Sequence, residues 1–417
     1  MTMLHNRPLA RAAYDVEAIR ADFPILAERP YGKPLVYLDN AASAHKPRAV
    51  IERMTRAYEH EYANVHRGLH FLANAATEAY EAARESVRRF LNAASSDEIV
   101  FTRSATEAIN LVAASFGLVH IGKGDEIVLS VMEHHSNIVP WHFHRERKGA
   151  VLKWVDVADD GSLSLEAFER ALTPRTKIVA VTQMSNVLGT APPIKEIVRI
   201  AHAHGVPVLV DGSQGAVHLD VDVRDLDVDF YVITGHKLYG PTGIGALYGK
   251  RAMLESLPPF NGGGEMIEDV TLDKVTYNRP PYRFEAGTPP IVQAIGLAAA
   301  LDYVEGVGRA SVRAHEQALS AYAHERLGAI HSLRIFGGAP GKGPIVSFVM
   351  QGAHPHDVAT VIDHLGVAVR AGTHCAMPLL RRFGVTSTCR ASFALYNTRA
   401  EVDALADALT HAQKLFA

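Results

Sequence analysis

The chain of 417 residues has little cysteine and little net charge. Its two cysteines, Cys375 and Cys389, exclude a disulfide framework and a metal site built on several thiolates, and they favour a reducing compartment. The 22 histidines contain no HExxH-type spacing, so we expect no metal site. A formal net charge of −3 gives no reason to expect nucleic acid or an anionic membrane as a partner.

Long apolar runs, repeats and targeting signals are also lacking. No window approaches the ~18 consecutive apolar residues that a membrane span needs, and the sequence has no repeat, heptad run or low-complexity tract. Residues 1–23 mix arginines with acidic residues and have no apolar core, which argues against a secretory signal or a transit peptide. We therefore expect a cytoplasmic protein without a membrane segment.

Short apolar segments alternate with longer amphipathic ones from about residue 75 to 250. Strands that are apolar throughout, joined by helices, predict an α/β fold with a mostly parallel sheet covered on both faces. The predicted strands are Glu98–Thr102, Glu126–Ser130, Lys177–Gln183, Pro207–Val210 and Asp229–Ile233. The predicted helices between them are Glu78–Leu91, Glu107–Phe116, Leu165–Leu172 and Ile194–His204.

The composition of the sequence changes after residue 250, where pairs of prolines and a run of glycines predict a stretch rich in loops. A helix is predicted from about Pro290 to Val304, followed by a mixture of helices and strands. We therefore expect a large domain over residues 24–305 and a smaller α+β domain made of residues 1–23 and 306–417.

Two consecutive predicted strands end in an acid and a lysine. Asp211 follows the apolar run Val206–Val210, and Lys237 follows the next strand. Ligands of such sheets bind beyond the carboxyl ends of the strands, so these side chains should meet there. A pyridoxal 5'-phosphate (PLP) site needs this pair, because the lysine forms the Schiff base and the acid keeps a proton on the pyridine nitrogen. Either residue alone could be a surface lysine or a helix cap, but both together, beside Gln214 and His236, favour PLP.

A phosphate cradle is predicted where the strand Glu98–Thr102 runs into a helix. Ser104 and Glu107 have the spacing of a capping box, which marks a helix N-terminus. The free N–H groups and the dipole of such a terminus attract phosphate, although most capping boxes only cap a helix. Thr234 and His236 could supply further donors from the neighbouring loop.

His134 and Asn186 follow two further predicted strands. An imidazole at that edge can stack on a planar cofactor and act as an acid or base near neutral pH. The alternative is that His134 and His135 are solvated loop residues. Asn186 could reach a cofactor oxygen or a substrate carboxylate, or it could be a turn residue before Gly189.

Two features near the C-terminus could carry chemistry. Cys375 lies in a mobile-looking loop next to His374 and near Arg370, where a thiolate would be stabilised. Cys389 lies in an apolar run and fits the usual buried, inert cysteine. Arg390 could hold a carboxylate in a bidentate fork, or it could form a surface ion pair.

Taken together, these motifs resemble those of the SufS-type (group II) cysteine desulfurases, which belong to the class V aminotransferase superfamily of fold-type I PLP enzymes. The likeness runs from about residue 15 to the C-terminus. The motifs that carry it are Tyr37–Ala42, Asn64–Gly68, Glu133–Trp141, Ser185–Gly189, Gly235–Gly243, Phe284–Pro289 and the Cys375 loop.

The resemblance implies PLP as the cofactor and a large domain built on a mostly parallel, seven-stranded type of sheet. It assigns Lys237 to the Schiff base, Asp211 to the pyridinium nitrogen, Gln214 to the ring oxygen, and His134 and Asn186 to contacts with the cofactor. The phosphate would be held by Ala105 through its backbone N–H, Thr106, Thr234, His236 and, from a second subunit of a homodimer, Thr288.

The resemblance also implies the reaction. Arg390, Arg370 and Asn186 would bind the substrate carboxylate, while Lys237 and His134 would serve catalysis and Cys375 would take the sulfur. L-cysteine would become L-alanine, with L-selenocysteine as a second candidate substrate. The Cys375 persulfide would pass to a small sulfur-acceptor protein of the SufE or SufU type, for iron–sulfur cluster assembly.

Three departures and several alternatives accompany the resemblance. Thr373, Ala105 and Pro290 stand where relatives often have other residues. A selenocysteine lyase, a cysteine sulfinate desulfinase or a kynureninase-like hydrolase would share the PLP site. A non-catalytic PLP-binding scaffold would lack Lys237 or Asp211, and both are present.

Overall fold

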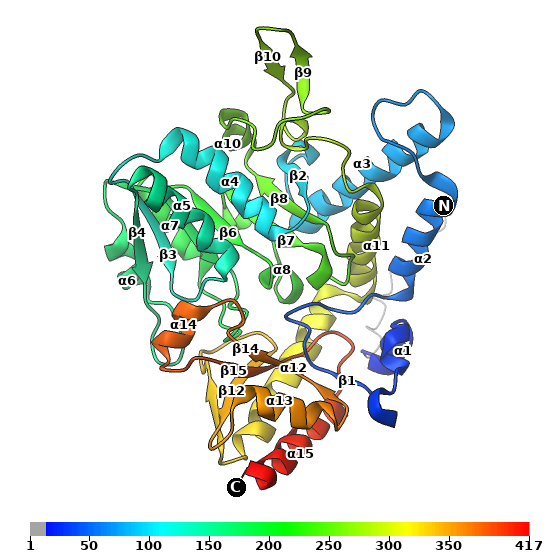
Figure 1. Cartoon of the computed structure of the whole chain (residues 1–417), viewed down its shortest axis with the longest axis vertical. Coiled ribbons are helices and arrows are strands. Elements are labelled where there is room, and N and C mark those ends of the chain that lie inside the picture. The colour runs from blue at the N-terminus through cyan, green and yellow to red at the C-terminus, as the bar shows by residue number, and fades with distance from the viewer. Residues whose placement is uncertain (1–13, 417) are drawn as a thin grey trace, which may run out of the picture.

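A seven-stranded sheet forms the centre of the larger part of the protein (Figure 1). The computed structural model describes residues 14–416, so residues 1–13 of the predicted N-terminal arm, and Ala417, lie outside the described residues. The strands of this sheet are β2 (Ile99–Thr102), β3 (Glu126–Ser130), β4 (Val151–Val155), β5 (Thr176–Thr182), β6 (Val208–Asp211), β7 (Phe230–Thr234) and β8 (Gly245–Gly249). Their order is β2-β8-β7-β6-β5-β3-β4, in which β3 to β7 pair in parallel and β8 is antiparallel to β2 and β7. The predicted α/β fold with a mostly parallel sheet is confirmed.

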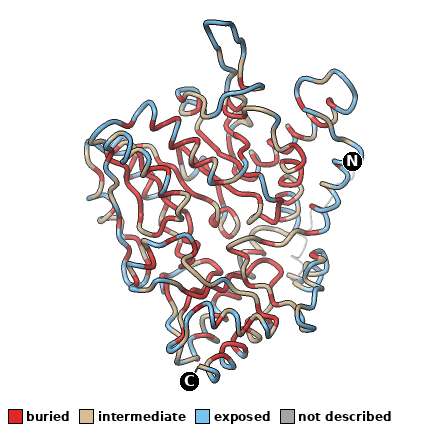
Figure 2. The backbone as a smooth tube through the Cα atoms, in the orientation of Figure 1, coloured by how far each residue is buried: buried red, intermediate tan, exposed pale blue. Residues whose placement is uncertain are grey.

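Most of these strands are buried at every position, which explains why their sequences are apolar throughout. Successive side chains point to opposite faces, so Val128 packs into one core cluster whereas Ile127 and Leu129 pack into the other. The buried segments run through the middle of the molecule (Figure 2). Helices α3 (Phe71–Leu91), α7 (Ile194–Ala203) and α11 (Ile291–Val307) contribute to the first cluster, and α4 (Ala105–His120) and α5 (Val139–Lys148) to the second.

Each predicted strand is present, with ends that differ by at most one residue from the predicted ones. Strands β4 and β8 were not predicted. β4 is partly exposed along its length, so it lacks a long apolar run. β8 begins and ends with glycine, and at Gly245 a Cβ atom would lie 2.7 Å from the backbone of Ser104, so the strand can pack there only without a side chain.

A four-stranded antiparallel sheet forms a second core below the first (Figure 1). Its order is β11-β12-β15-β14, and a separate short pair, β1 (Val36–Tyr37) with β13 (Val367–Ala368), brings an N-terminal segment against it. The limits predicted for the two domains stay a prediction. The strands are β11 (Leu333–Phe336), β12 (Ile345–Met350), β14 (Arg370–Gly372) and β15 (Thr388–Ser392), packed with α12 (Arg309–Gly328), α13 (Pro355–Asp363) and α15 (Arg399–Phe416).

The stretch predicted to be rich in loops contains a β-hairpin. Strands β9 (Ile267–Val270) and β10 (Val275–Tyr277) pair antiparallel and project from the top of the molecule in Figure 1. Most of their residues are exposed, so the pattern offered no apolar signal for a strand.

The remaining helices are short or peripheral. Within residues 14–416 no single helix has the length and apolar character to cross a membrane; α11 and α12 reach that threshold only as a pair, bent by 77°. The short or peripheral helices are α1 (Val16–Ala21), α2 (Arg48–Arg56), α6 (Leu165–Ala171), α8 (Gly215–His218), α9 (Val223–Leu226), α10 (Arg251–Ser256) and α14 (Met377–Arg382).

Candidate active site

A cavity of about 300 Å³ lies between the carboxyl ends of the large sheet and the edge of the small one. Every predicted site residue except Thr288 lines it. These residues are Ala105, Thr106, His134, Asn186, Asp211, Gln214, Thr234, His236, Lys237, Arg370, Cys375 and Arg390. The sequence therefore located the cavity, while the contacts below refine what its residues do.

The first wall of the cavity, here called the sheet wall, is formed by residues that follow β3, β6 and β7. Asp211 is the last residue of β6 and is 4% exposed, and Lys237 lies in the turn after β7. Burial lowers the pKa of Lys237 to about 8, although the carboxylate of Asp211 acts in the opposite direction. A lysine with a lowered pKa is more often neutral, and only the neutral amine is a nucleophile or a base.

Gln214 lies beside Asp211 but uses its amide nitrogen elsewhere. Its Nε2 donates a hydrogen bond to the carbonyl oxygen of Ala41 at 2.7 Å. Its Oε1 is buried and has no hydrogen-bond partner within the described part of the chain. The predicted donation to a ring oxygen would require the amide to turn round, so that assignment stays a prediction.

His134 is a neutral ring in this structure. Burial, followed by the charge of Lys237, lowers its pKa to about 4. Nδ1 of His134 accepts a hydrogen bond from the backbone N–H of Ser136 at 3.1 Å, so the proton of the neutral ring is on Nε2. The ring is thus poised as a neutral partner of a planar cofactor, and not as a cation.

Glu133, the chain neighbour of His134, was not identified from the sequence and is fully buried. Its carboxyl group accepts hydrogen bonds from the hydroxyl of Ser130 and from Nδ2 of Asn137. Burial raises the pKa of Glu133 to about 8, and the nearby carboxylate of Asp211 adds to that rise. Because the residue stands in a polar motif, its full burial could not be expected from the sequence.

The predicted helix N-terminus is present, but its capping box is only half formed. α4 begins at Ala105, and the hydroxyl of Ser104 accepts a hydrogen bond from the N–H of Glu107 at 3.3 Å. The carboxylate of Glu107 accepts from the N–H of Arg103, and not from that of Ser104 as a capping box requires. The Thr106 hydroxyl lies 2.7 Å from that of Ser136, at the rim of the cavity. Free N–H groups at this terminus suit a phosphate.

His236 and Thr234 complete this end of the cavity. Burial, followed by the charges of Lys237 and Lys46, lowers the pKa of His236 to about 4. Lys46 donates to the carbonyl oxygen of His236 at 3.1 Å, which ties the turn to an N-terminal segment. The two side chains can therefore offer neutral donors at this end of the cavity.

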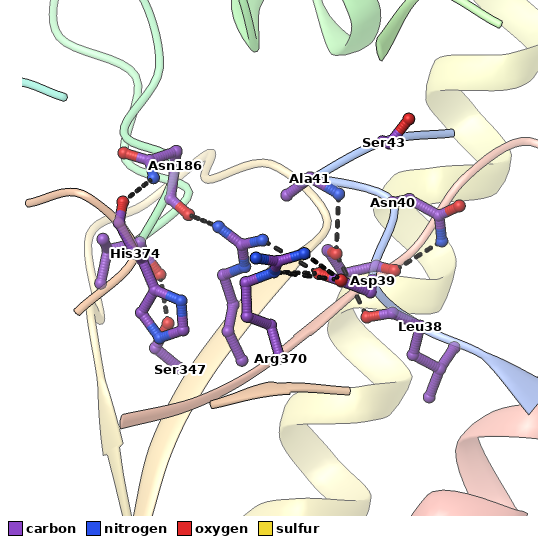
Figure 3. A network of polar contacts seen from close by, with 12 residues as sticks. Leu38, Asp39, Asn40, Ala41, Ser43, Asn186, Ser347, Arg370 and His374 are labelled. Atoms are coloured by element: carbon purple, nitrogen blue, oxygen red, sulfur yellow. Dashed lines mark hydrogen bonds and ion pairs between the residues drawn. The ribbon is translucent and has the colours of Figure 1, made fainter. Parts of the chain in front are cut away.

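The opposite wall, here called the arginine wall, consists of Arg370, Arg390 and the Cys375 turn, with Asp39 behind them. Asp39 binds Arg370 through contacts of 2.9 to 3.1 Å (Figure 3). It also binds Nη2 of Arg390 at 3.2 Å. Nη1 of Arg390 donates to the carbonyl oxygen of Asn186 at 2.9 Å. Arg390 is only 2% exposed, so the alternative of a surface ion pair is wrong.

Cys375 is exposed to the cavity at the tip of a turn that is fixed on both sides. The residue and its neighbour His374 adopt left-handed backbone conformations, with φ angles of 54° and 51°. Nδ2 of Asn186 donates to the carbonyl oxygen of His374, and the N–H of His135 donates to that of Cys375, both at 2.7 Å. The loop that looked mobile in the sequence is a short turn, held by hydrogen bonds from Asn186 and His135.

His374 does not stabilise a thiolate as a cation, which corrects the expectation from sequence. Burial, followed by the charge of Arg390, lowers its pKa to about 3. Its Nε2 lies within 3.1 Å of both the carbonyl and the hydroxyl oxygen of Thr388, facing the small core. Cys375 instead acts on the cations of the cavity, because its charge raises the pKa values of Lys237, Arg370 and Arg390.

Cys389 and Thr288 lie outside the cavity. Cys389 is 1% exposed, its Sγ lies 3.1 Å from the carbonyl oxygen of Pro355, and burial raises its pKa to about 12. This matches the expected inert cysteine. Thr288 lies near the edge strand β2, where it lines two other hollows, so a single chain does not bring it to the cavity.

Comparison with known proteins identifies the family. Residues 36–405 match the aminotransferase class V family. The chain belongs to that family. It is 50% identical to the probable cysteine desulfurase of Halalkalibacterium halodurans over 95% of this chain and 98% of that protein. It is also 50% identical to the cysteine desulfurase of Synechococcus elongatus over 96% of its own length, where it spans 64% of the relative.

The chain is also similar to solved structures of cysteine desulfurases. The cysteine desulfurase CsdA of Escherichia coli superposes with a TM-score of 0.91 at 41% identity, over 97% of this chain and 100% of that one. The apo cysteine desulfurase of Thermococcus onnurineus gives a TM-score of 0.89 at 38% identity, over 96% and 98%.

The cofactor of this family is PLP, and the residues of the cavity fit it. A lysine with a lowered pKa and a buried carboxylate stand at adjacent strand ends, as the carbonyl and the pyridine nitrogen of PLP require. The N-terminus of α4 offers N–H groups at the edge of the cavity, which Ser104, Ala105 and Thr106 line.

Proposed function

We propose that the chain is a PLP-dependent cysteine desulfurase that converts L-cysteine to L-alanine and leaves the sulfur on Cys375. The observation that carries this proposal is the position of Cys375. Its thiol is exposed to the cavity that holds Lys237 and Asp211, whereas Cys389, the other cysteine, is buried in the small core.

When bound, PLP draws electrons from the substrate Cα, which makes the Cα proton acidic and the Cβ–S bond labile. Lys237 is suited to move that proton, because burial keeps its pKa near 8 and a large fraction of the amine is neutral near that pH. Asp211, at the end of β6, would supply the negative charge that balances the protonated pyridine nitrogen of PLP. Its Oδ1 accepts a hydrogen bond from the Ser213 N–H at 2.9 Å.

The substrate is oriented by the arginine wall. Arg390 lines the cavity, and each of its Nη atoms makes one hydrogen bond, to Asn186 and to Asp39, which leaves a second N–H on each for a carboxylate. Asn186 links this arginine to the carbonyl oxygen of His374, so the carboxylate site and the Cys375 turn are held in one network.

Sulfur transfer balances without an external oxidant. The Cys375 thiolate attacks the substrate sulfur, an S–S bond forms and the Cβ–S bond breaks. Cβ keeps the electron pair of the broken bond and takes a proton, which gives alanine and a Cys375 persulfide. The fixed turn is an advantage here, because an attacking atom must be held close to its target.

The finer assignments belong to the same proposal. The persulfide passes to a small acceptor protein of the SufE or SufU type, for iron–sulfur cluster assembly in the cytoplasm.

The chain works as a homodimer in which Thr288 reaches the phosphate of the other subunit, since Thr288 does not reach its own cavity. The large and small domains are residues 24–305 and the remainder, and L-selenocysteine is a second substrate.

Replacing each cysteine tests the proposal. Cys375→Ala should lower alanine formation from L-cysteine by roughly a thousandfold or more, because only this thiol can take the sulfur. Cys389→Ala is the matched control and should retain the activity. Mass spectrometry after incubation with L-cysteine should find one added sulfur on the Cys375 peptide. Alanine release by Cys375→Ala at the wild-type rate, or sulfur on Cys389, would show that the proposal is wrong.

A further inference from the structure

His135 lies outside the cavity but contacts the Cys375 turn at two points. Its backbone N–H donates to the carbonyl oxygen of Cys375 at 2.7 Å. Nε2 of its ring accepts a hydrogen bond from the N–H of Met377 at 3.1 Å, although the two residues are 242 positions apart. Within residues 14–416, the lining of the cavity includes His134 and Ser136 but not His135. The ring of His135 therefore contacts the turn and not the space for a substrate.

The bond to the ring satisfies a backbone group that the helix leaves free. Met377 is the first residue of α14, and the N–H groups in the first turn of a helix have no partner inside that helix. An imidazole can accept this N–H only as a neutral ring with its proton on Nδ1. Burial lowers the pKa of His135 from its ordinary value, which favours the neutral ring. The beginning of α14 is thus fastened to the segment that follows β3.

The backbone of the turn requires contacts of this kind. Cys375 and His374 have φ angles of 54° and 51°, which residues other than glycine seldom adopt. Such a conformation persists only where the surrounding structure holds it. Asn186 holds the side of His374 through its 2.7 Å hydrogen bond, which Figure 3 shows. On the side of Met377, the sheet wall contributes the two bonds of His135.

The other end of α14 is held differently. Nε of Arg382 binds both carboxylate oxygens of Asp156 at 3.0 Å, but the side chain of Asp156 is 63% exposed. Exposed ion pairs contribute little to stability, and salt screens them. The contacts that decide where the thiol of Cys375 lies are therefore those at the beginning of the helix.

We propose that His135 is a positioning residue for sulfur transfer, which holds the beginning of α14 so that the thiol of Cys375 faces the substrate sulfur. This inference rests on the desulfurase activity proposed above. A displacement of about 1 Å can cost a reacting group roughly a hundredfold in rate, so loss of the ring contact should slow the attack on sulfur. Binding of L-cysteine should change little, because the residues assigned to it line the cavity and His135 does not.

The test is the rate of alanine formation from L-cysteine in the first turnover, before removal of the persulfide sulfur can limit the reaction. His135→Leu loses the acceptor and should lower this rate by roughly tenfold or more, while the L-cysteine concentration that gives half the maximal rate changes by less than about twofold. His135→Gln can place an amide oxygen near the position of Nε2, and it should return the rate to within roughly threefold of the wild-type value. An unchanged rate in His135→Leu, or no recovery in His135→Gln, would overturn the inference.

His354→Leu is the matched control. Nδ1 of His354 accepts a hydrogen bond from the N–H of His356 at 3.3 Å at the beginning of α13, so this variant removes the same kind of bond away from the lining of the cavity. Its first-turnover rate should equal that of the wild type. If the ring of His135 only capped α14, His135→Leu would behave in the same way, with lower thermal stability and an unchanged rate.

Hydrogen–deuterium exchange measures the bond itself. In the protein as purified, the peptide that contains Met377 should exchange one more amide rapidly in His135→Leu than in the wild type or His135→Gln. Equal exchange in all three would contradict the inference. If His135→Leu does not fold, His135→Asn takes its place, because its shorter amide cannot reach Met377. A wild type that forms no alanine from L-cysteine would refute the desulfurase proposal, whereas the exchange would still decide whether His135 holds the turn.

Discussion

The sheet wall and the arginine wall enclose the same cavity, but they shift the pKa values of their buried titratable groups in opposite directions. On the sheet wall, burial and the carboxylate of Asp211 raise the pKa of Glu133 to about 8. On the arginine wall, burial and the charge of Arg390 lower the pKa of His374 to about 3. Both groups are therefore neutral near pH 7. Each wall thus surrounds its functional charges with titratable groups kept in their uncharged form.

The two walls also differ in how they are built. The sheet wall gathers the carboxyl ends of β3, β6 and β7, which a parallel sheet places along one edge. The arginine wall joins segments that are far apart in sequence, since Asp39 and Arg370 are separated by 331 positions. The first wall is a consequence of the fold, whereas the second depends on a few specific contacts.

The largest effect is expected on the sheet wall. Lys237→Ala should lower alanine formation from L-cysteine by roughly a thousandfold or more, because the variant loses both the covalent attachment of PLP and the base. In the wild type, borohydride reduction followed by peptide mapping should place PLP on the Lys237 peptide alone. Label on another lysine, or full activity of the variant, would remove Lys237 from the centre of the sheet wall.

This difference between the walls also explains what the sequence could predict. Asp211 and Lys237 were recognisable because each follows an apolar run that predicts a strand, and parallel strands bring their ends together. Cys375 was recognisable because its loop contrasts with the apolar run around Cys389. The positions of the predicted strands were accurate to one residue, since full burial makes such segments apolar throughout.

What the sequence missed depends on tertiary contacts. Asp39 lies in a motif that was recognised, but nothing local shows that its carboxylate meets two arginines from the other end of the chain. His374 was expected to assist the thiolate as a neighbour of Cys375, yet the turn directs its ring to Thr388. Glu133 was missed because burial of a carboxyl group requires partners, here Ser130 and Asn137, whose geometry no spacing rule supplies.

The second-largest effect is expected in the pH dependence of stability, through the raised pKa of Glu133. An unfolded Glu ionises near ~4.3, whereas the folded one ionises near 8, so between these values the folded chain holds a proton that the unfolded chain has lost. The stability that Glu133 confers is therefore complete below about pH 4 and is lost as pH rises to about 8. Glu133→Gln does not titrate, and its amide can donate to Oδ1 of Asn137, which is buried and has no partner in the described chain.

Urea unfolding should show this difference. Relative to the wild type, Glu133→Gln should gain stability as pH rises from 5 to 8, by roughly 1 to 4 kcal/mol in total, since one pKa unit corresponds to about 1.4 kcal/mol. The exposed Glu325→Gln is the control and should track the wild type. A difference that is constant with pH would mean that Glu133 is not held neutral by the sheet wall.

The smallest effect is expected on the arginine wall, and it has the opposite sign. An unfolded His binds a proton near ~6.5, whereas folded His374 does so only near 3, so the unfolded chain holds more protons between these values. The stability that His374 confers is thus present above about pH 6.5 and is lost as pH falls. His374→Gln should cost about 1 kcal/mol at pH 8, through the weakened bond to Thr388, and this deficit should shrink as pH falls from 7 to 5. Thermal unfolding across this range, with the exposed His411→Gln as control, measures the change. A deficit that widens in acid would mean that His374 carries a proton in the fold, and the opposition between the two walls would then be lost.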